Sequence, residues 1–119
     1  EFRRVLFRSE NVLGPGLRDL MDRHPIVGDV RGLGTFWAVE FVLDRATKEP
    51  AVPYLGAKPG EPNPVNEVVA ECKKRGMLPF ATANRIHMVP PCNVSEAEAK
   101  EGIAILDEAL SAGDKYAKA

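Results

Sequence analysis

The chain has 119 residues and a formal net charge of −1, since 16 lysines and arginines nearly balance 17 aspartates and glutamates. Hydrophobic residues make up 45% and charged residues 28%, the composition of one globular domain with a core rather than of a disordered or fibrous chain. The charge balance argues against nucleic acid as a partner, which would require a basic patch. No apolar run approaches the ~18 residues of a membrane span.

The first nine residues, EFRRVLFRS, lack an initiator methionine, and Glu-Phe is the pair that a common restriction site encodes in frame. We interpret residues 1–9 as a translated cloning or adapter segment and leave them out of the expected fold. On this interpretation the chain is a fragment of a longer protein. The alternative is a basic amphipathic arm that binds a membrane or a partner.

A short helix is expected over residues 15–24, because Leu17, Leu20 and Met21 recur at helical spacing and Pro25 ends the pattern. Residues 26–43 are rich in β-branched and aromatic side chains. They predict a short strand, a tight Gly-Leu-Gly turn and a longer strand. Because both faces of the longer strand are apolar, we expect it at the centre of a sheet.

Residues 44–64 are expected to form a loop, since five of the ten prolines fall there. Asn63 and Pro64 then start a helix as its N-cap and first residue. Gly76 is expected as its left-handed C-terminal cap. The helix carries an apolar stripe made of Val65, Val68, Val69 and Cys72.

Short strands are expected over residues 77–80 and 85–89, and Ser95-Glu96-Ala97-Glu98 forms a capping box that opens a last helix. This order of elements predicts an α+β fold, with a small, mostly antiparallel sheet of about four strands and helices packed on one face. Residues 10–112 would form one domain, and residues 113–119 would form a frayed tail.

Few side chains suggest chemistry. We expect His24 to be a helix cap or surface residue and Cys72 to be a packing residue. Cys92 lies near a helix start without a base or acid to work with it. A metal site formed by His24, Cys72, His87 and Cys92 would lack the short ligand spacings that such sites show, so we reject it. Two free cysteines fit a reducing, cytoplasmic compartment.

Arg85 and His87 are the candidate substrate-binding residues. On a strand they point to the same side, while Ile86 and Met88 point into the core. An arginine holds a carboxylate with two parallel hydrogen bonds, so the pair could bind an acid group. The alternative is that both lie on a solvated face, with Arg85 paired to a nearby acid.

Two blocks resemble the class III pyridoxal-phosphate aminotransferases. HPIVGDVRGLG, from His24 to Gly34, looks like the family's H-P-x-[IV]-G-[DE]-V-R-G-x-G segment. The strand that ends at Pro90-Pro91, followed by EGIAILDEAL over residues 101–110, is similar to the end of the same proteins. The variant from Asn84 to His87 looks most like the branch that acts on taurine, β-alanine and other ω-amino compounds.

The resemblance implies a fold-type-I enzyme, normally a homodimer. In the family a large domain holds pyridoxal phosphate on a lysine, and a C-terminal small domain closes over the amino donor and the 2-keto acid. This chain resembles the small domain alone, so the large domain would be its partner. None of its seven lysines matches the family's catalytic lysine motif. We therefore expect the chain alone to have no catalytic residue, to bind no pyridoxal phosphate and to transfer no amino group.

Many relatives place a carboxylate-binding arginine three residues before the first proline of the Pro-Pro pair, where this chain has His87. Arg85 stands two residues earlier on the same strand face, so we expect it to bind the carboxylate with His87 alongside. We expect Arg31 to brace the small domain against the large one. A second hypothesis, from a different functional class, is that the chain is a free-standing α+β binding module. Trp37 and Phe41 would then belong to its interface.

Overall fold

The computed structural model describes residues 2–118, and it describes their side chains except those of Phe2, Arg3 and residues 5–7. The elements in chain order are α1 (Phe2–Arg23), β1 (Val27–Leu33), β2 (Phe36–Asp44), β3 (Glu49–Pro50), α2 (Pro64–Lys74), β4 (Phe80–Thr82), β5 (Arg85–Met88) and α3 (Glu96–Asp114). The expected α+β class is confirmed. Within the described residues, none of the helices is both long and apolar enough to span a membrane.

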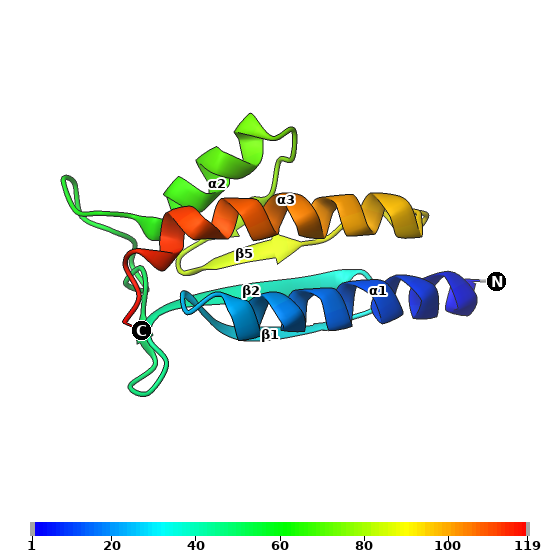
Figure 1. Cartoon of the computed structure of the whole chain (residues 1–119), viewed down its shortest axis with the longest axis horizontal. Coiled ribbons are helices and arrows are strands. Elements are labelled where there is room, and N and C mark those ends of the chain that lie inside the picture. The colour runs from blue at the N-terminus through cyan, green and yellow to red at the C-terminus, as the bar shows by residue number, and fades with distance from the viewer. Residues whose placement is uncertain (1, 119) are drawn as a thin grey trace.

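The five strands form one antiparallel sheet in the order β1-β2-β5-β4, with the two-residue β3 paired to β2. β2 is the central strand, as its two apolar faces predict. Figure 1 shows α1 and α3 side by side, running in the same direction along the sheet, with α2 next to α3. The side chains that fill the core between these layers include Trp37, Val39 and Phe41 of β2 and Ile86 of β5.

Helix α1 is longer than the helix expected over residues 15–24. It has 22 residues and contains Pro15 in its interior, so it also includes residues 2–9. A proline removes one hydrogen bond of the helix and usually breaks it. Here Leu13 on one side of the proline and Leu17 on the other are both buried in the same core. Packing against the rest of the fold therefore stabilises a continuous helix where the local sequence predicts a break.

Glycines on both sides of Pro15 allow this close packing. A Cβ atom on Gly14 would lie 3.0 Å from the Trp37 ring, and one on Gly16 would lie 2.6 Å from Ile103 of α3. The same holds at the end of β1, where a Cβ on Gly32 would lie 2.4 Å from both the carbonyl oxygen of Phe36 and the Trp37 ring. Glycine is thus required where the backbone approaches Trp37.

Two features of the middle segment follow the predicted chemistry and one departs from it. Asn63 caps α2 by accepting a hydrogen bond from the backbone N–H of Asn66, and Gly76 has a φ of +91°. β4 starts at Phe80, later than the strand expected from residue 77, because Pro79 has no N–H to donate to a neighbouring strand. The loop over residues 44–64 is irregular apart from β3, and buried Ala51 and Val52 tie it to the core.

The C-terminal end differs from the frayed tail expected over residues 113–119. The capping box at Ser95 is present, and α3 continues to Asp114. Beyond it the Tyr116 hydroxyl donates a hydrogen bond to Glu67 at 2.6 Å, and the backbone N–H of Lys118 donates one to the carbonyl of Leu43 at 2.8 Å. Residues 114–118 are therefore held to α2 and β2.

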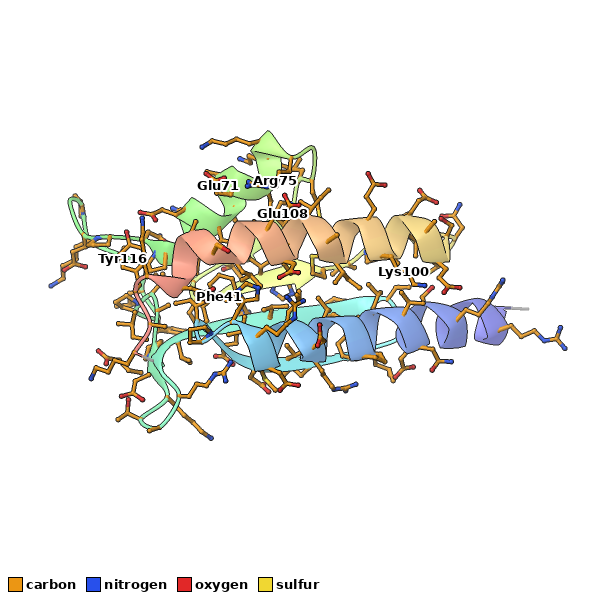
Figure 2. All side chains as sticks on the ribbon, viewed as in Figure 1. Phe41, Glu71, Arg75, Lys100, Glu108 and Tyr116 are labelled. Carbon is orange, nitrogen blue, oxygen red and sulfur yellow. The ribbon has the colours of Figure 1, made fainter. Side chains whose placement is uncertain are left out.

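An ion-pair cluster joins α2 to α3 on the surface. Arg75 contacts Glu71 at 2.6 Å on its own helix and Glu108 of α3 at 2.9 Å, and these three side chains lie together in Figure 2. Hydrogen bonds from Lys74 and Arg75 lower the pKa of Glu71 to about 2. The cluster thus adds ion pairs to the packing of α2 against α3.

Candidate functional site

The site residues expected from the sequence lie on the face of the sheet opposite α1 and α3. Arg85 and His87 share this face with Glu40 and Ala38 of β2, because the strand register pairs Glu40 with Arg85 and Ala38 with His87. Ile86, between the two, is fully buried on the other side. The structure thus brings Arg85 and His87 together, as the alternation along a strand predicts.

Two hollows meet at this face. The first is a shallow groove of about 800 Å³ lined by Arg31, Gly32, Leu33, Phe36, Ala38, Arg85 and His87. The second, of about 710 Å³, lies between the β4–β5 hairpin and α3 and is mostly apolar, with Met77, Phe80 and Ile105 in its wall. Phe36 and His87 line both hollows. A ligand that crosses the groove would therefore meet a charged end at Arg85 and an apolar end beyond His87.

Large apolar side chains are exposed around both hollows. They are Leu33, Phe36, Leu78, Phe80 and Val89, with exposed fractions between 50% and 79%. An exposed apolar patch of this kind is typical of a surface that another protein segment covers. Trp37 and Phe41, expected at an interface in the binding-module interpretation, are buried at 1% and 0% exposure, so that expectation was wrong.

The side chain of His87 lies between two phenylalanine rings. Its ring centroid lies 5.9 Å from that of Phe36 and 5.6 Å from that of Phe80. Burial lowers the pKa of His87, and the positive charges of Arg85 and Arg31 lower it further. The ring is therefore neutral at pH 7. Its Nε2 atom accepts a hydrogen bond of 3.3 Å from Nε of Arg85, which requires the ring proton to be on Nδ1.

Arg85 has no ion pair among the described residues, although Glu40 stands directly across from it. Instead, Oε2 of Glu40 accepts a hydrogen bond of 2.7 Å from Arg31, and Oε1 accepts one of 3.2 Å from Asn84. The hydrogen bond from Arg31 lowers the pKa of Glu40 against the opposing effect of burial. The alternative interpretation of Arg85, as the partner of a nearby acid, is therefore not what the structure shows.

His24 was expected to be a helix cap or a surface residue; it follows α1 directly but is buried, since only 7% of it is exposed. Its Nδ1 lies 2.6 Å from Asp114 and its Nε2 lies 2.6 Å from Asp107, both on α3. Arg23 adds two hydrogen bonds of 3.0 Å to Asp107. The cluster joins the end of α1 to α3. The sequence signal that could have revealed it is the spacing of seven between the two aspartates, which places them on one face of a helix.

The two cysteines show no partnership suited to catalysis. Cys72 is buried, and this burial raises the pKa of its thiol to about 11, so it is a packing residue as expected. Cys92 is exposed, and its nearest polar contact is the hydroxyl of Thr35 at 3.8 Å. In the described part of the chain, no three histidine, cysteine, aspartate or glutamate side chains are grouped to hold a metal ion.

The lysines lie away from both hollows. Lys74, Lys100, Lys115 and Lys118 form exposed ion pairs, with side chains 63% to 74% exposed. Neither hollow has a lysine in its wall. Because pyridoxal phosphate is held through a lysine Schiff base, the hollows of this part of the chain do not fit that coenzyme by themselves.

Comparison with known proteins shows which family the chain is similar to. The family model described as aminotransferase class III matches residues 3–110. The taurine–pyruvate aminotransferase of Bilophila wadsworthia is 36% identical over 103 residues, which are 81% of this chain and 21% of that protein. The 5-aminovalerate aminotransferase of Pseudomonas putida is 31% identical over 93% of this chain and 25% of its own length.

Solved structures share the fold. Taurine:2-oxoglutarate aminotransferase from Bifidobacterium kashiwanohense matches 96% of this chain with a TM-score of 0.85 and 24% identity, over 25% of its own length. The ω-transaminase of Pseudomonas jessenii matches 97% with a TM-score of 0.80 and 25% identity, over 24% of its length. The chain spans between a fifth and a quarter of the length of these two aminotransferases. It belongs to the class III aminotransferase family.

Proposed function

We propose that this chain is the substrate-closing small domain of a pyridoxal-phosphate transaminase, with residues 10–112 as the domain proper and residues 1–9 as an added segment. The family match over residues 3–110 and the taurine–pyruvate aminotransferases among the relatives support the assignment to this small domain, and the match also takes in residues 3–9. In the intact enzyme, a cytoplasmic homodimer, an amino group would move from an ω-amino compound such as taurine or β-alanine to a 2-keto acid such as pyruvate.

In this proposal a large domain holds pyridoxal phosphate and supplies the reactive lysine. When bound, the coenzyme forms the Schiff base and stores the amino group between the two half-reactions. The role left to this chain is to bind and orient the substrates and to exclude water. The exposed apolar side chains around the two hollows, such as Phe36 and Phe80, are suited to packing against that large domain.

The observation that carries the substrate-binding role is the free guanidinium of Arg85. It lies at the edge of a groove, its only polar contact among the described residues is neutral His87, and the acid opposite it is engaged elsewhere. A guanidinium in this state binds a carboxylate or a sulfonate through charge-assisted hydrogen bonds. Arg85 would thus bind the acid group of the substrate, with His87 beside it.

Replacing Arg85 with glutamine in the intact enzyme is expected to raise KM for pyruvate by a factor of about 10 to 100, because a hydrogen-bonded ion pair contributes ~1.5–3 kcal/mol. Turnover of an amine that lacks an acid group should change little. Steady-state kinetics with both kinds of substrate measure the difference. Lys100→Gln, which removes an equal charge from the exposed surface of α3, is the control. An unchanged KM for pyruvate in Arg85→Gln would contradict the role.

Two experiments test the assignment as a whole: one measures coenzyme binding to the chain, and the other sequences the DNA upstream in the native gene. Mixed with pyridoxal phosphate, the 119-residue chain is expected to give no internal-aldimine absorption band that survives gel filtration. The DNA upstream of the codon for Glu10 is expected to encode, in frame, a large domain with its lysine. A stable band, or an upstream stop codon followed by an independent start, would overturn the proposal in favour of a free-standing binding module.

A further inference from the structure

Glu40 and Arg85 stand opposite each other without forming an ion pair. They are register partners on the adjacent strands β2 and β5, and their side chains share the open face of the sheet. Opposite charges at such positions lie ~5 Å apart at Cβ and ordinarily attract each other. The neighbourhood holds two arginines and two acids, Arg31, Arg85, Asp29 and Glu40, which is enough for two separate pairs.

The ion pairs among these four side chains are nevertheless distributed unequally. Arg31 contacts both acids, with Nη1 at 2.7 Å from Asp29 and at 2.7 Å from Glu40. The second carboxylate oxygen of Glu40 is occupied by the amide of Asn84, which lies next to Arg85 in the turn between β4 and β5. Both oxygens of the acid nearest to Arg85 are therefore in use.

Arg85 is meanwhile held by a neutral group. Its Nε donates to Nε2 of His87, and none of its other nitrogens has a protein partner among the described residues. A hydrogen bond through Nε fixes the plane of the guanidinium without neutralising its charge. The two terminal nitrogens remain available for the paired oxygens of an acid.

We propose that Arg31 and Asn84 are positioning residues that keep Arg85 available to an anionic substrate, by engaging Glu40, which would otherwise pair with Arg85. The inference rests on the proposed role of Arg85 and extends it: Glu40 is an internal competitor for the substrate's acid group. The ligand is recognised as a carboxylate or sulfonate by its charge and its paired oxygens.

The pairing is tested first without any ligand, by following the Glu40 carboxyl carbon by NMR during an acid titration of the whole 119-residue chain. Arg85→Gln should leave the pKa of Glu40 low, because Arg85 is not its partner. Arg31→Gln should also leave the pKa below its ordinary range, because Arg85 takes over. The double variant Arg31→Gln/Arg85→Gln should raise it to that range or above, since burial and the charge of Asp29 are then opposed only by the hydrogen bond from Asn84.

Two results of the titration would overturn the inference. In one, Arg31→Gln raises the pKa of Glu40 as much as the double variant does, so that Arg85 never takes over. In the other, Arg85→Gln alone raises it, so that the two residues are already paired. Arg4→Gln, which removes one positive charge from an exposed position of α1, is the control and should change nothing.

The consequence for binding is tested with sodium pyruvate at constant ionic strength, using the Nε–H signal of Arg85, which the Arg85→Gln variant identifies. Arg31→Gln is expected to weaken pyruvate binding about tenfold, a change that corresponds to one ion pair. Arg31→Gln/Glu40→Gln, which also removes the competitor, should restore it. Failure of this rescue would overturn the competitor role of Glu40. If the unaltered chain binds no pyruvate while the titration behaves as expected, the proposed substrate role of Arg85 fails and the pairing of Arg31 with Glu40 stands.

Discussion

Replacing His24 with alanine is expected to lower the free energy of unfolding by about 3 kcal/mol, because it removes two hydrogen bonds to carboxylates, worth ~1.5 kcal/mol each. Both ring nitrogens lie 2.6 Å from an aspartate of α3. Without the ring, Asp107 and Asp114, whose side chains are 32% and 24% exposed, would each lose this hydrogen-bond partner. Urea denaturation of both proteins at pH 7 measures the difference.

An unchanged free energy of unfolding in His24→Ala would contradict this account of the cluster, because it would mean that the ring does not hold the end of α1 to α3.

Positive charge is favourable at this end of the two helices. α1 and α3 run in the same direction, so the ends that carry partial negative charge lie at the same side of the domain (Figure 1). Arg45 supplies positive charge there, since it donates hydrogen bonds to the carbonyls of Met21 and His24 at the end of α1 and of Val27 in β1. Arg23→Ala is the matched control for the prediction. Its side chain is 48% exposed, so its loss should destabilise the fold much less than the loss of His24.

The same cluster gives a dependence on acid. Hydrogen bonds from Arg23 and then from His24 hold the pKa of Asp107 below its ordinary value. The unfolded chain therefore binds the proton first, so the stabilisation is complete above about pH 4 and is lost as the pH falls below it. Asp107→Asn should remove this part of the difference between unfolding at pH 7 and at pH 3. An unchanged difference would show that Asp107 does not carry it.

Replacing Trp37 with alanine is expected to lower the free energy of unfolding by about 4 kcal/mol, as for other large-to-small changes at buried aromatic positions. The ring is 1% exposed, its Nε1 donates to the carbonyl of Gly34 at 2.9 Å, and Arg18 stacks 5.2 Å from its centre. Two glycine backbones, at Gly14 and Gly32, are fitted against it, so the neighbours cannot close the space without moving α1.

Circular dichroism in urea is the suitable measurement, because this is the only tryptophan and the variant has no tryptophan fluorescence to follow. The neighbouring Phe36→Ala is the control. Its side chain is 61% exposed on the open face, so the change should cost ~0.5 kcal/mol or less. Equal effects of the two variants would mean that Trp37 does not hold α1 to the sheet.

Local chemistry accounts for the parts of the fold that the sequence predicts well. The cap at Asn63, the capping box at Ser95 and the left-handed Gly76 each depend on a few adjacent residues, and all three are present. The length of α1 depends on distant contacts instead. Gly-Pro-Gly predicts a break in the helix from the local sequence alone. The helix continues because Trp37 and Ile103 pack against these glycines.

The site shows the same division. That Arg85 and His87 share a face follows from the twofold alternation of any strand. That Glu40 stands opposite Arg85 depends on the register of β2 against β5, and the residues between the two strands do not encode it locally. The partners of His24 lie 83 and 90 positions along the chain, so neither could be read from the surrounding residues.

Strand β5 separates two tasks on alternate residues. Ile86 and Met88 serve the core, whereas Arg85 and His87 face outward over the groove. Point substitutions at the outward positions can therefore change the lining of the groove over evolutionary time while the folded state persists. A one-residue insertion or deletion in this segment would do the reverse, because it would exchange the two sets and bury a guanidinium where an isoleucine belongs. Natural variants of this hairpin should accordingly differ by replacement and keep their length.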